Sequence, residues 1–148
     1  VQNTGTIDQF VRVSVYRYWT DEGGNKLRDL SPELIDIHFL TENGWVIDEE
    51  STTRARTVLY YTSVLAADAD PVQFADSITV SSEVADSVTQ TETQVEGGTV
   101  ITTTYDYNGV SFHVEVTVDA VQTHHAEDAI LSAWGRSVTI SGDTLSLN

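Results

Sequence analysis

Two adjacent histidines and two carboxylates are gathered in the short stretch "THHAED". His124 and His125 come first, and Glu127 and Asp128 follow. Imidazole and carboxylate groups bind Zn²⁺, and a zinc ion with an open position can activate water for hydrolysis. Adjacent residues do not share a helix face, and neither H-E-x-x-H nor H-x-x-E-H occurs. His124, His125 and Glu127 are therefore weak metal candidates, and the pattern favours a solvent-exposed polar junction.

The remaining reactive groups form no specific catalytic pattern. "DADP" (Asp68–Pro71) resembles the start of a calcium loop but lacks the full pattern, so it predicts a turn. The chain has no cysteine, no G-x-S-x-G elbow and no glycine-rich phosphate loop. His38 and His113 are interpreted as solvent-exposed spacers on polar strand faces. We predict no catalytic residues, no cofactor and no enzymatic activity. Four aromatic residues could stack on a sugar ring, but core packing is the more frequent fate of aromatic residues in strands: Trp19, Trp45, Tyr60 and Tyr61.

The net charge of −16 limits the partners of the chain. Seven Lys and Arg residues cannot neutralise a row of phosphates, so we expect no nucleic-acid partner. An anionic membrane surface is disfavoured for the same reason, and no apolar run is long enough to insert into a bilayer. The acidity is instead typical of a protein that must stay soluble outside the cell.

The composition and the patterning predict a β-rich fold. Thr occurs 20 times and Val 19 times, and β-branched residues suit the half-buried surface of a sheet. Alternation is most regular in Ile7–Trp19 and Ser111–Gln122. With no linker or repeat, residues 1–148 are expected to form one antiparallel β-sandwich domain. Further strands are predicted at Leu34–Leu40, Thr57–Leu65, Asp76–Val84 and within Arg136–Asn148. Turns are predicted at Asn43–Gly44, which leads into Trp45 and Val46, and near Gly97–Gly98, Asn108–Gly109 and Ser141–Asp143.

One segment has the period of a helix. From Ala126, apolar residues recur at offsets of 3, 4, 7 and 8, which places them on one helical face. Glu127 and Asp128 fall in the first turn, where negative charge favours the helix dipole. Gly135 follows at a position where helices commonly end. A short amphipathic helix is therefore predicted near residues 125–134.

Several stretches resemble one protein family. "VQNTGTIDQFVRVSVYRYW", "LIDIHFL…NGW", "TVLYYTSVL" and "VTVDAVQTHHAEDAILSAWG" are similar, in this order, to the TasA/camelysin-like family of exported bacterial proteins released by a SipW-type signal peptidase. The resemblance implies a jelly-roll-like β-sandwich at the bacterial cell surface or in the extracellular space. It also implies a role in biofilm-matrix fibres, in which an N-terminal strand of one subunit completes the sheet of the next.

The chain departs from this family at its start. Relatives carry a strand-forming segment before the N-T-G stretch, whereas this sequence begins directly at Val1. If that segment was removed, we expect an unfilled sheet edge. Camelysin-type members have been described as metallopeptidases, but no zinc-binding motif here carries that activity over.

We therefore expect a secreted structural protein that self-associates into fibres by β-strand addition, or donor-strand complementation. Other matrix or cell-surface proteins are further possible partners. The long apolar stretch Ile7–Trp19 is a plausible participant, because unpaired backbone groups of a sheet edge accept a neighbour's strand. The alternatives are a cell-surface metallopeptidase built around His124 and, by fold analogy alone, a carbohydrate-binding module.

Overall fold

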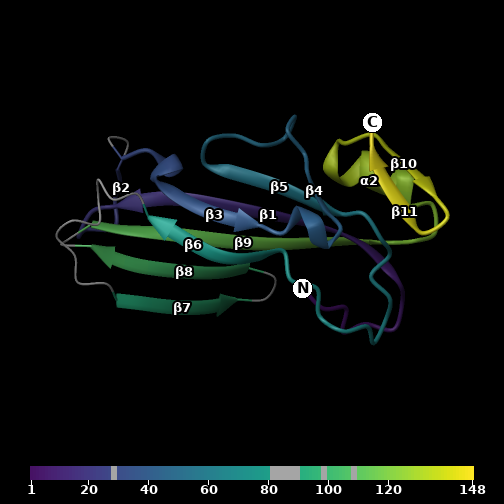
Figure 1. Ribbon diagram of the computed structural model, residues 1–148, viewed down its shortest axis with the longest axis horizontal. Helices are drawn as coiled ribbons and strands as arrows, with labels where there is room; N and C mark the ends of the chain where they lie inside the picture. The colour runs from purple at the N-terminus through teal and green to yellow at the C-terminus, as the bar shows by residue number, and fades with distance from the viewer. Residues whose placement is uncertain (28–29, 81–90, 98–99, 108–109) are drawn as a thin grey trace.

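The structure is a computed structural model, and it describes residues 1–27, 30–80, 91–97, 100–107 and 110–148. For residues 91–97 and 100–107 only the backbone is described. The predicted all-β, sandwich-like fold with one short helix is confirmed (Figure 1). Its elements are β1 (Gln9–Thr20), β2 (Lys26–Leu27), η1 (Pro32–Leu34), β3 (Ile35–Phe39), η2 (Thr41–Asn43), β4 (Trp45–Ile47), β5 (Arg56–Tyr61), β6 (Ala75–Val80), β7 (Thr91–Gly97), β8 (Val100–Tyr107), β9 (Val110–Gln122), α2 (Ala126–Trp134), β10 (Val138–Ser141) and β11 (Thr144–Leu147).

A large antiparallel sheet forms the centre of the molecule. Its strands follow the order β4-β5-β1-β9-β8-β7, and β2 pairs with the end of β1. The longest pairing joins β1 and β9, from Gln9 opposite Gln122 to Thr20 opposite Ser111. Because β1 also pairs with β5 from Arg12 to Tyr16, it is an inner strand. The expectation that Ile7–Trp19 takes part in edge pairing is therefore wrong: both sides of this strand are occupied over most of its length.

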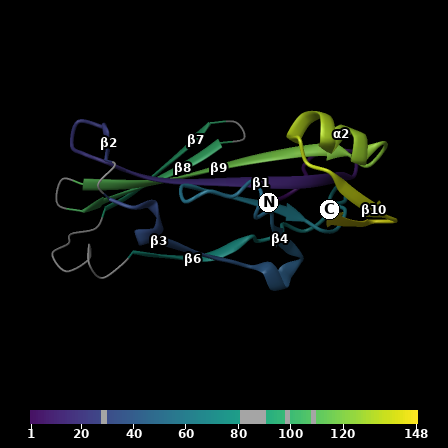
Figure 2. The ribbon, with the colours of Figure 1, turned by 90° about the horizontal axis from the view of Figure 1, so that it is seen from above.

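One face of the large sheet is covered by the two-stranded sheet β3–β6. In Figure 2 these two strands form a separate layer, and α2 lies on the opposite side of the large sheet. The valine face of β1 is buried beneath the β3–β6 layer, as its alternation predicts. Ile7 departs from this pattern, since it precedes the strand and is 48% exposed. The buried members of this core are Val11, Val13, Val15, Trp19, Ile35, Ile37, Trp45, Leu59, Leu65, Phe112 and Val114.

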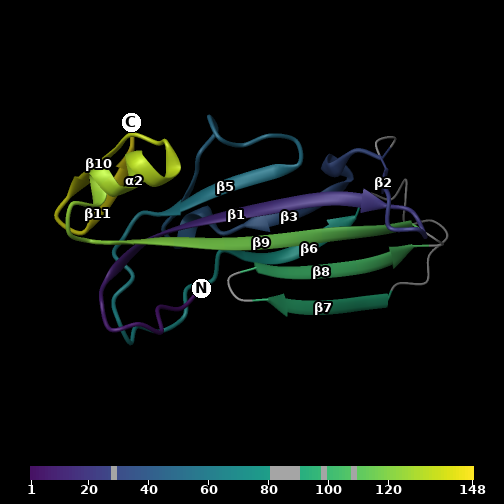
Figure 3. The same cartoon turned by 180° about the vertical axis from the view of Figure 1, so that it is seen from behind.

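The other face of the large sheet is covered at one end by α2 and the β10–β11 hairpin (Figure 3). The predicted helix is confirmed, and it ends at Gly135, whose positive φ of 67° suits glycine. The N–H of Gly135 donates to the carbonyl of Leu131 at 3.0 Å. The predicted turn within the last segment is also present, with Gly142 at φ 63°. This second core buries Phe10, Val58, Tyr60, Ala126, Ile130, Val138 and Leu145.

Some predicted features lie outside the described residues. These are the turn at Asn108–Gly109, residue Gly98 of the other predicted turn, and residues 81–84 of the strand expected at Asp76–Val84. The backbone pairing of β7 with β8, from Thr91 opposite Asp106 to Gly97 opposite Val100, agrees with the predicted hairpin. In the part of the chain that the structure describes, no helix has the length and apolar character needed to cross a bilayer.

Candidate assembly edge

The β3–β6 layer is narrower than the sheet that it covers. Only two strands form this layer, whereas six strands lie side by side in the large sheet. In Figure 1 the layer lies in front of β1 and β9, and no described strand lies in front of β8 and β7. Among the described strands, β3 is the sole partner of β6. The layer therefore ends at the outer edge of β6, and beyond that edge no described strand covers β8 and β7.

The burial of the valines facing this layer changes from one strand to the next. Val13 and Val15 of β1 are 0% and 1% exposed. Their partners on β9, Val118 and Val116, share the same face but are only half-buried. On the same face of β9, Phe112 and Val114 are buried at 1% and 5% exposure, so the incomplete cover is confined to Val116 and Val118.

Ile78 of β6 shows the same incomplete cover. It lies directly opposite Ile37 of β3, and opposed residues of an antiparallel pair point to the same face. Ile37 is buried at 6% exposure, whereas Ile78 is 38% exposed. An apolar side chain on the core-facing side of β6 thus remains accessible beside the open edge.

A backbone ladder begins next to this edge. The N–H group of Val1 donates to the carbonyl of Val72, and the N–H of Val72 donates to the carbonyl of Val1, both at 2.7 Å. This mutual exchange is the pattern of an antiparallel hydrogen-bonded pair. The N-terminus lies on the side of β6 away from β3 (Figure 1). The ladder does not continue into β6, because the carbonyl of Phe74, just before β6, accepts a hydrogen bond from the N–H of Leu40, which follows β3.

The outer face of the β3–β6 layer carries an ion pair. Nδ1 of His38 lies 2.7 Å from Oδ1 of Asp76 on the neighbouring strand. Hydrogen bonding to Asp76, followed by its negative charge, raises the pKa of His38 above the ordinary 6.5. The same bond lowers the pKa of Asp76 below 3.8. His38 is exposed, as predicted, but it is a cross-strand partner of Asp76 and not merely a spacer.

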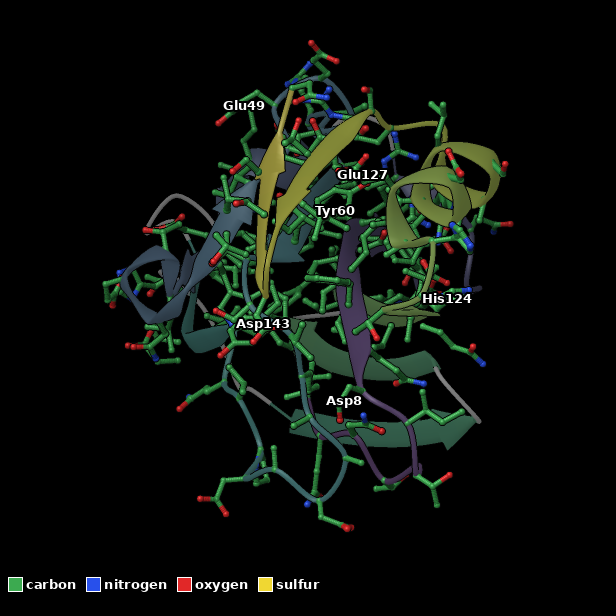
Figure 4. The ribbon with its side chains drawn as sticks, turned by 90° about the vertical axis from the view of Figure 1, so that its right-hand side faces the viewer. Asp8, Glu49, Tyr60, His124, Glu127 and Asp143 are labelled. Atoms are coloured by element: carbon green, nitrogen blue, oxygen red, sulfur yellow. The ribbon has the colours of Figure 1, made fainter. Side chains whose placement is uncertain are left out.

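The weak metal candidates are not brought together by the fold. The rings of His124 and His125 meet edge to face with centroids 4.0 Å apart. Oε1 of Glu127 instead accepts a hydrogen bond from the N–H of Ile140 at 2.7 Å. Figure 4 shows Glu127 beside the contact of α2 with the hairpin, and His124 away from it. Within the described residues, no group of three or more His, Cys, Asp or Glu side chains could hold a metal ion.

A shallow open pocket of ≈ 250 Å³ lies at the start of α2. Its lining is mainly polar and includes His125 and Glu127. Because Glu127 is engaged with the backbone of β10, the pocket offers no converging set of ligands. The residues around it are Thr123, His125, Ala126, Glu127, Asp128 and Ile140.

The aromatic candidates for sugar stacking belong to the two cores. Trp19, Trp45 and Tyr60 are 1%, 3% and 0% exposed, and Tyr61 is half-buried against Trp45. The indole N–H groups of the two tryptophans donate to the carbonyls of Ser31 and Gln73. Trp19, Trp45 and Tyr60 are therefore packed in the cores, as expected, and Tyr61 is partly buried against Trp45.

The loop that contains "DADP" forms a turn, as predicted. The N–H of Ala69 donates to the carbonyl of Ala66 at 3.2 Å, and Asp68 adopts a positive φ of 62°. One backbone hydrogen bond therefore closes this turn.

His113 belongs to a polar network that the sequence interpretation missed. Its ring stacks on Tyr18 with centroids 4.8 Å apart, and its Nε2 lies 2.7 Å from Oγ1 of Thr20. The hydroxyl of Tyr18 donates to Oε1 of Glu115 at 2.9 Å, and Lys26 lies over the Tyr18 ring. The interpretation of His113 as a solvent-exposed spacer is therefore wrong. The network could have been found only from the pairing register of β1 and β9, which sets Tyr18 opposite His113.

No protein-family description, curated protein or solved structure matches this chain in the three comparisons made.

Proposed function

We propose that this chain is a secreted structural protein, a subunit of extracellular fibres or of a biofilm matrix at the bacterial cell surface. Subunits assemble when the outer edge of β6 accepts a β-strand from a second copy. The similarity of the stretches quoted above to the TasA/camelysin-like family supports this role. The observation that carries the proposal is the incomplete cover beside β6, where Ile78 is 38% exposed on the core-facing side.

The incoming strand has two tasks at this edge. Its backbone pairs with N–H and C=O groups of β6 that no described strand occupies, which supplies affinity without regard to sequence. The carbonyl of Ala75 already accepts a hydrogen bond from Gln73. Its alternate side chains point toward the large sheet, where Ile78, Val116 and Val118 are incompletely covered. Full burial of one such side chain contributes about 1.5–3 kcal/mol, so an apolar, alternating strand is favoured.

The net charge sets the conditions for assembly. Subunits of charge −16 repel one another, and salt screens such repulsion beyond about 10 Å at 0.1 M ionic strength. We expect more polymer at pH 4–5, or with added calcium, than in dilute buffer at pH 8. Light scattering and electron microscopy of the full-length mature protein measure this directly. Scattering that stays flat and grids without filaments under all these conditions contradict the proposed function.

A charge on the core-facing side of β6 tests the site of addition. Ile78→Lys places a cation where the new strand would bury an apolar surface, and inward-pointing charges are a recognised block to edge pairing. Because Ile78 is already 38% exposed, the monomer tolerates this change. We expect the rate of filament growth to fall at least tenfold, measured by light scattering under conditions in which the unchanged protein assembles.

The matched control for this variant is Leu131→Lys. Leu131 is also an exposed apolar residue, at 53%, but it lies on α2, far from β6. The control carries the same change in net charge and should assemble like the unchanged protein. Equal growth of the two variants, with both monomers folded by circular dichroism, places strand addition elsewhere than at β6.

A further inference from the structure

We propose that His38 and Asp76 form a clasp that holds β6 on β3 in the shape that accepts a strand, and that this clasp makes strand addition dependent on pH. The inference rests on the proposed function, because it concerns the regulation of the same edge. It adds a specific residue pair to the general effect of net charge.

The clasp lies where the pairing of the two strands is irregular. His38 is opposite Ser77 and Phe39 is opposite Ala75, so Asp76 is an extra residue without a partner of its own in the ladder. A bulge of this kind interrupts the ladder locally. The contact of 2.7 Å between His38 and Asp76 spans this interruption. An isolated pair of strands is only marginally stable, so one cross-strand contact can change how firmly β6 is held.

The charges around His38 are acidic on every element that faces it. Asp76 lies on β6, Asp36 on β3 itself, and Glu42 on the short helix η2 that follows β3. All three negative charges favour the imidazolium form, and the bond to Asp76 is the largest cause of the raised pKa. A protonated His38 therefore also reduces the local negative charge that an acidic second copy meets.

The direction of the pH effect follows from the two pKa shifts. The pKa of His38 is raised, so its contribution is complete below 6.5 and is lost as pH rises through the raised value. The pKa of Asp76 is lowered, so its contribution is complete above 3.8 and is lost as pH falls through the lowered value. The charge attraction in the clasp is complete between 3.8 and 6.5 and is lost as pH rises through the raised pKa of His38.

The first test uses dilute, monomeric protein. Amide hydrogen exchange of β6 is followed across pH 5.5–8.5 and corrected for intrinsic rates, while NMR follows the titration of the His38 ring. We expect protection of β6 amides to fall roughly two- to fivefold, the scale of an exposed ion pair, as His38 loses its proton. In H38Q the protection should be low throughout and insensitive to this titration. H124Q, which removes an exposed histidine distant from β6, should behave like the unchanged protein.

The second test measures filament growth over the same pH range. A step that follows the His38 titration in the unchanged protein and in H124Q, but is absent in H38Q, supports the clasp. If H38Q assembles with an unaltered pH profile, the clasp is overturned while the proposed function stands. If the unchanged protein forms no filaments at any pH, the proposed function fails. β6 protection that does not change with His38 protonation overturns the clasp by itself.

Discussion

The edges of β10 and β6 are treated differently by the same chain. At β10, helix α2 lies alongside the strand, and Glu127 accepts a hydrogen bond from the backbone N–H of Ile140. Ile130 of the same helix is 0% exposed. At β6, none of the described strands pairs with the outer edge, and Ile78 remains 38% exposed on the core-facing side. One edge is thus capped by a side chain and a helix, and the other leaves apolar surface beside free backbone groups.

The ion pairs of the two regions differ in burial, and therefore in how much they contribute to stability. The closed end is fixed by a buried ion pair, in which Nε of Arg136 donates to Asp48 at 3.1 Å and Asp48 is 0% exposed. The ion pair of the β3–β6 layer joins exposed side chains, His38 at 60% and Asp76 at 45% exposure. Exposed pairs contribute little, whereas loss of one partner of a buried pair is costly. The β6 edge can therefore be altered by pH or by a new strand without unfolding the closed end.

The largest effect is predicted for removal of the buried carboxylate at the closed end. Asp48→Ala leaves Arg136 without its buried partner, and it also removes the acceptor for the hydroxyl of Ser51. We expect the free energy of unfolding to fall by about 3–5 kcal/mol, as for other buried pairs broken on one side. Urea denaturation of the monomer measures it.

Glu50→Ala is the control for this prediction. Glu50 contacts the same Arg136 at 3.3 Å, but its side chain is 73% exposed. Its loss should lower the free energy of unfolding by less than about 1 kcal/mol. Equal effects of the two substitutions would show that burial does not distinguish the two contacts of Arg136.

A smaller effect is predicted for opening the closed edge. Glu127→Ala removes the acceptor of the Ile140 N–H group and leaves the outer edge of β10 uncapped. We expect a loss of about 0.5–1.5 kcal/mol of stability, the usual net value of one hydrogen bond. We also expect weak, concentration-dependent association in analytical ultracentrifugation, because an uncapped edge can pair with another chain.

Asp128→Ala serves as the comparison for the Glu127 variant. It removes one negative charge from the first turn of the same helix, near the positive end of the helix dipole. In the part of the chain that the structure describes, no hydrogen bond joins Asp128 to β10. Its sedimentation should stay that of the unchanged protein. If Glu127→Ala also sediments as the unchanged monomer, capping by this carboxylate does not protect the β10 edge.

Local patterns predicted the long strands and the helix well. The alternation of Val11, Val13 and Val15 and the spacing of Ala126 and Ile130 match the buried faces, although Ala133 of the predicted helical face is exposed. They do not report which strands become neighbours. The central position of β1 was missed because pairing with β5 and β9 depends on residues far along the chain, and the contact of His38 with Asp76, 38 residues apart, was missed for the same reason.

The assembly edge was predictable only in part. The resemblance implied an open sheet edge, but it did not point to β6. Choosing β6 required two facts, the number of strands in the β3–β6 layer and the exposure of Ile78. Both depend on how the two sheets pack, which the sequence pattern does not report. Glu127, one of the weak metal candidates, is bonded to the backbone of β10, a contact that no sequence motif encodes.

The smallest predicted effect is a change in the pKa of Tyr18, on the face of the large sheet opposite the β3–β6 layer. Burial and the bond to Glu115 raise the pKa of Tyr18 to about 12. In a spectrophotometric titration of phenolate, with Tyr18→Phe to assign the signal, Tyr18 should ionise well above the ordinary value of 10.0. Glu115→Gln keeps an acceptor but removes the negative charge, so the pKa should fall while staying above 10.0, since burial is the larger cause. A pKa unchanged by Glu115→Gln would mean that burial, without the charge of Glu115, raises it. This face would then resemble the closed end, where contacts are fixed by burial, more than the β6 edge, where they respond to charge.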